Sequence, residues 1–308
     1  MRERPVGRWV HLPLLILATL ALAPLAFMFT TALGESGRTL RAEVSLLPML
    51  VPQTWRWENF AEVWQKVPFL RYYLNSLVIS FLVTFGQVLT SAMAAYAFAR
   101  LEWPGRNRIF LAYLATLMIP GAVTMIPNFI LMKSLPELFT GWFPFVDWLS
   151  LRHLTPDPAS PLFGRWVGLD SYFALILPGM FSAYGTFLLR QFLLNQPREL
   201  EEAAEMDGCG HARIFVHVTL PLAAPGLATL AIFTFMGSWG SFLWPLVTVN
   251  HDELRTLPLG LQAFQGQYGT EWHLLMAAAL LMLVPILVVF VAGQRLFLRG
   301  LLLGGVKG

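Results

Sequence analysis

Charge is scarce in this chain. Asp, Glu, Lys and Arg make up 13% of its 308 residues, whereas hydrophobic residues make up 56%. A soluble globular domain carries about a quarter charged residues, so the composition excludes an ordinary soluble fold and predicts a lipid-facing surface. The mean hydropathy of +0.60 agrees with that prediction. The formal net charge of +3 is too small to indicate a nucleic-acid partner.

Cysteine and histidine are also sparse. The single cysteine, Cys209, excludes an intrachain disulfide. Even His211 and His217 lie six residues apart, on different sides of a helix. We therefore expect no metal site and no cofactor. The sequence has no G-x-x-x-x-G-K-[ST] motif, so any nucleotide chemistry must belong to a partner.

Long uncharged stretches, in contrast, are abundant. A helix needs about 20 consecutive apolar residues to cross the hydrocarbon core of a bilayer. Six such stretches occur, and none contains Asp, Glu, Lys or Arg between its ends. The fold class expected is an all-α membrane protein with six transmembrane helices. The stretches cover residues 11–31, 72–99, 109–132, 171–189, 220–249 and 273–294.

The first stretch follows Arg2, Arg4 and Arg8, as in a signal peptide. Its apolar part is longer than the roughly 7–15 residues of a signal sequence. We interpret it as an uncleaved first span, with a cleaved signal as the alternative.

The distribution of Lys and Arg between the loops indicates the orientation. The short loop after the second stretch contains Arg100, Arg106 and Arg108, which places it in the cytoplasm. Both termini are then cytoplasmic, and we expect a multi-pass protein of the bacterial inner membrane.

Proline and glycine mark the sites where the spans should bend. Pro120-Gly121 and the stretch 237–240 are the predicted kinks. Such kinks either line a path through the membrane or reflect irregular packing, and the sequence leaves both open.

The most informative segment lies between the fourth and fifth stretches. Pro197 suits the first turn of a helix, and the acidic residues that follow suit its positive N-terminal end. Asp207-Gly208 ends this helix, because Gly208 can adopt the left-handed conformation. A second short helix is expected over residues 211–217, and Pro221 then opens the fifth span.

This helical hairpin is interpreted as a docking element, with an amphipathic helix on the membrane surface as the alternative. Surface helices usually present Lys and Arg to the lipid headgroups, whereas this one carries four glutamates and two alanines. Because anionic headgroups repel acidic side chains, docking to another protein is favoured. We interpret its acidic residues as a solvated run at the start of a helix.

The hairpin resembles the EAA loop of ABC importer permeases. The pattern is Glu202-Ala203-Ala204, three residues, Gly208, nine residues and then Val218-x-Leu220-Pro221, with Val218 in place of the family's Ile. The resemblance implies coupling helices that enter a groove of a cytoplasmic ATPase. The implied coupling residues are Glu202, Ala203, Ala204, Asp207, Gly208, Leu220 and Pro221.

Further segments, at 188–192, 233–239, 242–246, 256–261, 265–269 and 305–308, resemble the carbohydrate-uptake branch of this family, and within it the six-span permease of the maltose system. The resemblance implies the type I ABC importer permease fold over residues 72–294. Residues 1–71 would hold the N-terminal segment, first helix and external loop, and 295–308 a cytoplasmic tail. One departure is Gly240-Ser241, where many relatives have Asn-Asp.

By the same resemblance, this chain is one half of a path with alternating access. Its implied partners are a second, non-identical permease, two ATPase subunits that hydrolyse ATP, an extracytoplasmic solute-binding protein and membrane lipid. The chain itself is not expected to be an enzyme. Candidates for the translocation path are Gly237, Ser238, Trp239, Gly240 and Ser241, and candidates for the binding-protein contact are Gln265, Gly266, Gln267, Tyr268 and Gly269.

The aromatic-rich segment 133–169 is interpreted as an interfacial segment on the outer face. Because the spans carry no fixed charge, a neutral polyol is preferred as the solute. An ion-coupled transporter usually needs intramembrane carboxylates or histidines, and a membrane enzyme needs a nucleophile–base pair or metal cluster. Neither is evident, so these two alternatives and a structural, non-transporting subunit stay as rivals.

Overall fold

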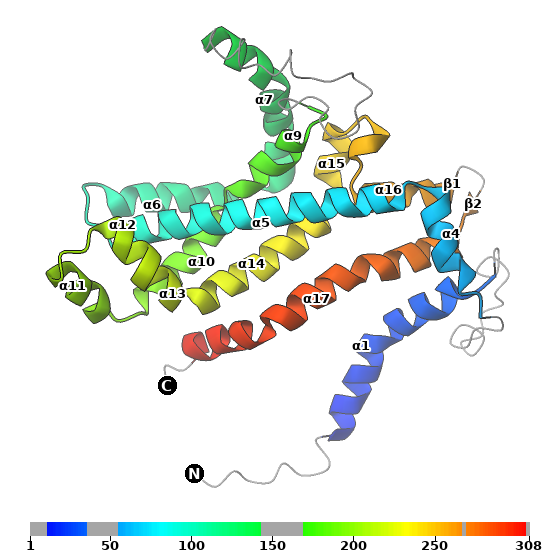
Figure 1. The fold of residues 1–308 in the computed structure, drawn as a ribbon, viewed down its shortest axis with the longest axis horizontal. Coiled ribbons are helices and arrows are strands. Elements are labelled where there is room, and N and C mark those ends of the chain that lie inside the picture. Colours follow the sequence, from blue (N-terminus) through cyan, green and yellow to red (C-terminus); the bar gives the residue numbers. More distant parts are fainter. Residues whose placement is uncertain (1–10, 36–54, 143–168, 267–268, 306–308) are drawn as a thin grey trace. The chain divides into compact units, whose positions relative to one another are not determined.

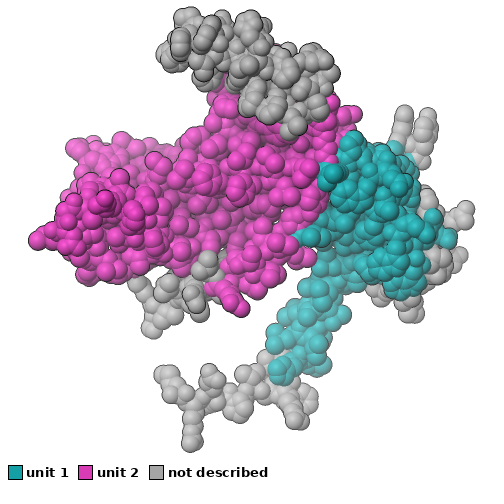
Figure 2. Space-filling model, in the orientation of Figure 1, with its two compact units in different colours: residues 1–70, 260–284 teal, residues 71–259, 285–308 magenta. Residues whose placement is uncertain are grey.

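The computed structural model describes residues 11–35, 55–142, 169–266 and 269–305. The described residues are almost entirely helical (Figure 1). They divide into two compact units, one of residues 1–70 with 260–284 and one of residues 71–259 with 285–308 (Figure 2). The sequence-based division into 1–71, 72–294 and 295–308 remains a prediction.

The first unit contains α1 (His11–Ala32), α4 (Glu58–Lys66), η6 (Leu261–Phe264), β1 (Gln265–Gly266), β2 (Gly269–Thr270) and the start of α17 (Trp272–Gly305). The α1 helix is apolar all round and exposes its leucines, as a lipid-facing helix does. Buried Asn59 joins α4 to the end of α1 by donating to the carbonyls of Ala32 (2.7 Å) and Gly34 (3.0 Å). It thereby satisfies acceptors that the end of a helix leaves open.

The second unit is built on α5 (Phe69–Ala99), a continuous helix of 31 residues. Its other elements are α6 (Arg106–Ala115), η2 (Thr116–Met118), α7 (Gly121–Trp142), α9 (Tyr172–Ile176), η3 (Leu177–Met180), α10 (Ala183–Leu194), α11 (Glu199–Met206), α12 (His211–Ile214), η4 (Phe215–Thr219), α13 (Leu220–Leu222), α14 (Ala224–Trp239), α15 (Leu243–Thr248), η5 (Asp252–Leu254), α16 (Leu257–Gly260) and the end of α17.

The described residues include four helices long and apolar enough to cross a membrane, at His11–Ala32, Phe69–Ala99, Tyr172–Leu194 and Trp272–Arg295. Two bent helix pairs bring the number to six when each pair counts as one span. The six-helix prediction is therefore confirmed, but its third and fifth stretches are not single straight helices.

The predicted kinks coincide with breaks in both of these stretches. The axes of Arg106–Met118 and Gly121–Leu135 differ by 101°. Ile119 is extended there because the ring of Pro120 disfavours a helical residue before it. In the fifth stretch, α14 ends at Trp239, and Gly240 to Phe242 separate it from α15. A further bend of 77°, which the sequence did not predict, separates His211–Leu222 from Ala224–Trp239.

Helices α5, α10 and α14 pack closely in the second unit. Their buried cluster is rich in alanine and includes Ala92, Ala95, Leu189, Leu193 and Leu230. Small residues let membrane helices approach closely. The hairpin α11–α12 lies at the end of α5 that bears Ala99, and α15 and α16 lie towards its other end (Figure 1).

Candidate functional site

The hairpin after α10 forms as the sequence predicts. Three glutamates occupy the first turn of α11, where the helix dipole favours negative charge. At the other end, Gly208 adopts φ +80° and donates its N–H to Glu205 O (2.9 Å), while Cys209 N–H bonds Ala204 O (2.9 Å). This pair of bonds is a Schellman motif, and it turns the chain towards α12.

The outer face of α11 is exposed within the described part of the chain. Glu202, Ala203, Asp207 and Gly208 are exposed, and Ala204 is half-buried. Met206 beside them exposes 89% of its surface. The other two predicted coupling residues lie further on: Leu220 packs against the buried cluster of α5, α10 and α14, and Pro221 opens α13 with an exposed ring.

Glu201 corrects the prediction of a wholly solvated acidic run. Its side chain is only 9% exposed and forms an ion pair with Arg100, whose Nε lies 2.9 Å from Glu201 Oε2. The Thr219 hydroxyl donates to Glu201 Oε1 over 3.0 Å. The two faces of α11 therefore differ: one is exposed, and the other is bound through Glu201 to the end of α5 and to Thr219.

Other polar contacts attach the same region. Arg198 Nη2 donates to Ala99 O over 3.3 Å, and Gln196 Nε2 donates to Leu222 O over 2.9 Å. Each contact joins the segment that enters α11 to the end of a membrane helix. The carbonyls of helix ends need such partners, so these bonds fix the hairpin's position.

A cavity of about 900 Å³ lies in the second unit, between α5, α7, η3, α14 and α15. Of the described residues that line it, none is charged. Polar contributions come from hydroxyl and amide groups such as Gln87 and Asn128, and aromatic ones from Tyr184, Phe233 and Trp244. Gln87 Nε2 also donates to Thr234 Oγ1 over 2.8 Å, which ties α5 to α14 at the cavity wall.

The predicted path residues meet at this cavity with one exception. Gly237, Ser238, Gly240 and Ser241 line it. Trp239 does not, because its side chain is fully buried and stacks on Phe235. The helix that carries Gly237 turns residue 239 to the opposite side, so Trp239 lies in the core, while the assignment of these five residues to a path stays a prediction.

Sequence reasoning missed the contribution of α5 to the cavity. Ser76, Ser80, Val83 and Gln87 line it at helical spacing. Three polar side chains at such spacing in an apolar span are a readable signal, because polar groups in membrane helices usually face the protein interior. Sequence reasoning also missed Asn128, a polar residue of α7 that lines the cavity.

One end of α5 is held by a network centred on Asn75. Its side chain donates to the carbonyls of Glu253 (2.9 Å) and Arg255 (3.0 Å) and accepts from the Tyr172 hydroxyl (2.6 Å). The neighbouring Ser76 Oγ accepts from Leu257 N–H over 2.7 Å. The α15–α16 connection is thus bound to the turn of α5 that contributes Ser76 to the cavity lining.

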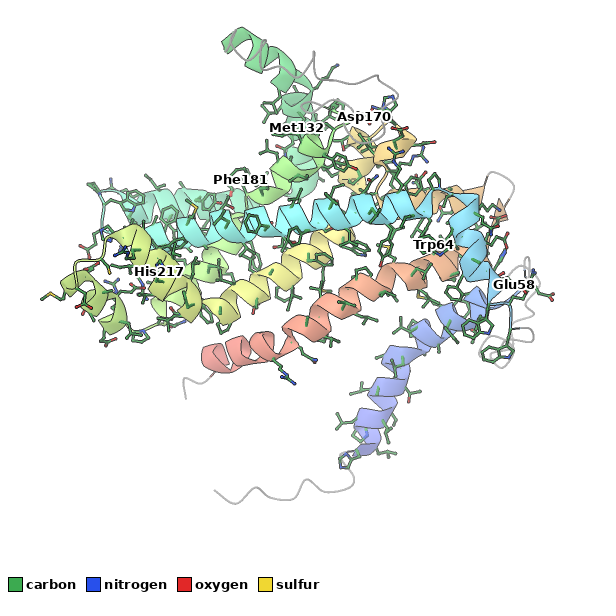
Figure 3. The ribbon with its side chains drawn as sticks, viewed as in Figure 1. Glu58, Trp64, Met132, Asp170, Phe181 and His217 are labelled. Carbon is green, nitrogen blue, oxygen red and sulfur yellow. The ribbon has the colours of Figure 1, made fainter. Side chains whose placement is uncertain are left out.

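Asp170 anchors the start of that connection (Figure 3). Its carboxylate accepts from the backbone N–H groups of Asn250 (3.0 Å) and His251 (3.2 Å) and pairs with the His251 ring. Burial raises the pKa of Asp170, but these hydrogen bonds outweigh burial and hold the pKa below its usual range. The residue also adopts φ +61°, which Asp tolerates better than most residues.

The predicted binding-protein contact falls on a small hairpin in the first unit. Gln265 and Gly266 pair antiparallel with Thr270 and Gly269, and all but Thr270 are exposed. Gln267 and Tyr268 lie outside the described residues. Most of the segment 133–169 also lies outside them. Within the described ranges, no group of three His, Cys, Asp or Glu residues could hold a metal ion.

Comparison with known proteins gives relatives over the whole chain. The arabinooligosaccharides transport system permease protein of Halalkalibacterium halodurans is 32% identical over 309 residues, covering 100% of this chain and 99% of that protein. The sn-glycerol-3-phosphate transport system permease protein of Yersinia pestis is 32% identical over 307 residues, covering 97% of each.

Solved structures agree on the fold. A chain from the crystal structure of a bacterial ABC transporter that imports the acidic polysaccharide alginate matches with a TM-score of 0.72 at 21% identity, covering 96% of this chain and 100% of that one. A model of binding-protein-dependent transport system inner membrane components matches residues 87–302. With the hairpin, the helices and these relatives together, this chain belongs to the binding-protein-dependent transport system inner membrane component family, the permeases of ABC importers.

Proposed function

We propose that this chain is one of two membrane-spanning subunits of an ATP-driven importer of a neutral sugar or polyol. The observation that carries the proposal is the hairpin α11–α12, whose exposed face has no partner site within the described part of the chain. Glu202, Ala203, Ala204, Asp207 and Gly208 would contact a separate ATPase subunit. Close contact is favoured by the two methyl side chains, and Glu202 would pair with a basic residue.

The hairpin is then cytoplasmic, and so are both termini. Arg100, Arg106 and Arg108 on the same side support this orientation, because short cytoplasmic loops are rich in arginine. On the opposite side, Gln265, Gly266 and Gly269 would meet a solute-binding protein, and a second permease would complete the path. The cytoplasmic location of α11 also explains why its charged face needs no shielding from lipid.

The uncharged cavity supports a neutral solute. Hydroxyl and amide groups can exchange hydrogen bonds with sugar hydroxyls, and aromatic rings stack on the apolar faces of sugars. An anionic solute would lose its hydration without gaining an opposite charge in this half of the path. Among relatives, the arabinooligosaccharide permease fits this chemistry better than the glycerol-3-phosphate permease.

Gly208 offers a sharp test of docking. A valine in its left-handed conformation costs roughly 1–2 kcal/mol, while a Cβ at this position would meet nothing within 4 Å. We expect Gly208→Val to leave membrane insertion unchanged but to weaken capture of the ATPase subunits about tenfold. Gly208→Asn should retain capture, because Asn tolerates this conformation.

Gly105 is the matched control. It has φ +83° and equally open surroundings, but it lies in the loop before α6. Gly105→Val should therefore capture the ATPase normally in the same pull-down from detergent-solubilised membranes. Normal capture by Gly208→Val would contradict the proposal.

The solute class has its own test. In proteoliposomes containing both permeases, the ATPases and the binding protein, uptake of labelled neutral oligosaccharides should exceed uptake of phosphorylated polyols. Preferential uptake of the anionic solutes would contradict the inference from the cavity while leaving the importer assignment intact.

A further inference from the structure

The ion pair of Arg100 with Glu201 joins the docking hairpin to the longest described helix of the second unit. Arg100 follows directly on α5, and its side chain is 5% exposed. Its Nε contacts both carboxylate oxygens of Glu201, at 2.9 and 3.1 Å, and its Nη2 donates to Gln196 O over 3.3 Å. Thr219 adds a third element through its hydroxyl.

A buried pair of this kind is a poor source of stability. Removing two charges from water costs several kcal/mol per ion, and their attraction repays that cost only when the geometry is good and the other polar atoms are satisfied. Both conditions hold here, since the Glu201 carboxylate and the Arg100 guanidinium each have a further partner. What such a pair supplies is a defined position, because any shift leaves a buried charge unpaired.

The position is relevant because of what α5 does elsewhere. The same helix that ends beside Arg100 lines the cavity with Ser76, Ser80 and Gln87. Gln87 and Arg100 are 13 residues apart, or about 20 Å along a helix. A continuous helix is a rigid element that can carry a displacement over that length.

Thr219 leads into the second wall of the cavity. It ends the π-helical segment η4, and π-helical turns are rare and often mark functional sites. Beyond it, α13 and α14 lead to Thr234, Gly237 and Ser238 at the cavity. Glu201 therefore contacts the starts of two routes to the cavity, one along α5 and one towards α14.

We propose that Arg100 and Glu201 are positioning residues that make α11 and α5 move as one body, so that movement of the docked hairpin changes the cavity wall. The proposal rests on the proposed docking function of the hairpin. It assigns the transmission step to the buried face of α11, and the ATPase contact to its exposed face. Neither residue is expected to touch the solute or the ATPase.

The test separates transmission from docking in the fully reconstituted transporter. Glu201→Gln keeps the shape of the side chain and its contact with Thr219 but removes the charge that Arg100 needs. We expect normal capture of the ATPase subunits and continued ATP hydrolysis. The amount of solute imported per ATP should fall about tenfold, which corresponds to about 1.4 kcal/mol of coupling free energy.

Two further variants keep the test decisive. The exchange Arg100→Glu with Glu201→Arg should restore part of the import per ATP, which a simple loss of packing would not allow. If Glu201→Gln fails to insert, Thr219→Val removes one hydrogen bond with little change in volume and should lower the same ratio more weakly.

Glu199→Gln is the matched control, because Glu199 is an exposed glutamate of the same helix that lies outside the proposed ATPase contact. It should leave both ATPase capture and the import per ATP normal. An unchanged ratio in inserted Glu201→Gln, or in Thr219→Val where Glu201→Gln does not insert, would overturn the positioning role. Normal ATPase capture by Gly208→Val would instead overturn docking itself, so the two failures are distinguishable.

Discussion

Several single polar side chains in this protein form hydrogen bonds with backbone groups at or near helix ends. Asn59 completes the end of α1, Asn75 holds the α15–α16 connection, and Asp170 accepts two N–H groups after α15. Each of these three side chains bonds backbone groups that would otherwise stay open, and an unsatisfied buried group costs about 1–3 kcal/mol.

Asp170 gives a pH prediction at this scale. Its pKa is lowered in the folded state, so its contribution to stability is present above the unfolded-state pKa of about 4 and is lost as the pH falls through the folded value. Asp170→Asn keeps the shape and tolerates φ +61° but lacks the charge. We expect it to lower the free energy of unfolding by about 1 kcal/mol at pH 7.

The measurement is thermal unfolding in detergent of wild type and variant at several pH values. The difference between them should be constant from neutral pH to about pH 5 and should shrink below about pH 4. A difference that grows on acidification would contradict the assignment.

The sequence was sufficient for residues with local roles. The turn at Gly208 and the acidic start of α11 follow from neighbouring residues alone. The burial of Glu201 could not be predicted, because its partner Arg100 lies 101 positions earlier in the chain. The burial of Trp239 was also not predicted, because its neighbours line a cavity while helical rotation turns its own side chain into the core.

At the scale of elements, close packing between α5, α10 and α14 depends on small residues. A Cβ on Gly185 would lie 2.5 Å from Ser91 Oγ and 3.2 Å from Leu230. We expect Gly185→Ala to destabilise the helix bundle by about 1–3 kcal/mol, because the helices must separate. The loss should appear as a lower melting temperature in detergent.

Ser91→Ala supplies the rescue, since Ser91 Oγ has no hydrogen-bond partner among the described atoms and its removal creates room. The double variant should recover part of the stability lost by Gly185→Ala alone. Gly237→Ala is the control, because a Cβ there meets nothing within 4 Å. Equal melting temperatures for Gly185→Ala and wild type would contradict the tight contact.

The prediction of the helices themselves depended on hydropathy and on helix-breaking residues such as proline. Six uncharged stretches gave the number of spans, and Pro120 gave the sharp bend in the third. The bend at Ala223 was not predicted, although Pro221 and Pro225 flank it. Prolines in membrane helices are often tolerated without a break, so their presence alone does not locate one.

At the scale of the whole molecule, the cavity that we propose as one half of a path has no Asp, Glu, Lys, Arg or His among the described residues that line it. We expect the purified chain alone to give no solute uptake in liposomes, with or without an ion gradient. Uptake should require the second permease, the ATPases, ATP and the binding protein. Gradient-driven uptake by the single chain would favour a secondary transporter instead.

The single cysteine of the chain follows the Gly208 turn directly and is partly accessible. A thiol-reactive fluorophore would therefore attach at one known position without any engineered substitution. Because that position borders the exposed face of α11, its emission would change when a motor subunit covers the hairpin. The native protein thus carries its own spectroscopic reporter of assembly, and a titration in detergent could read the affinity directly.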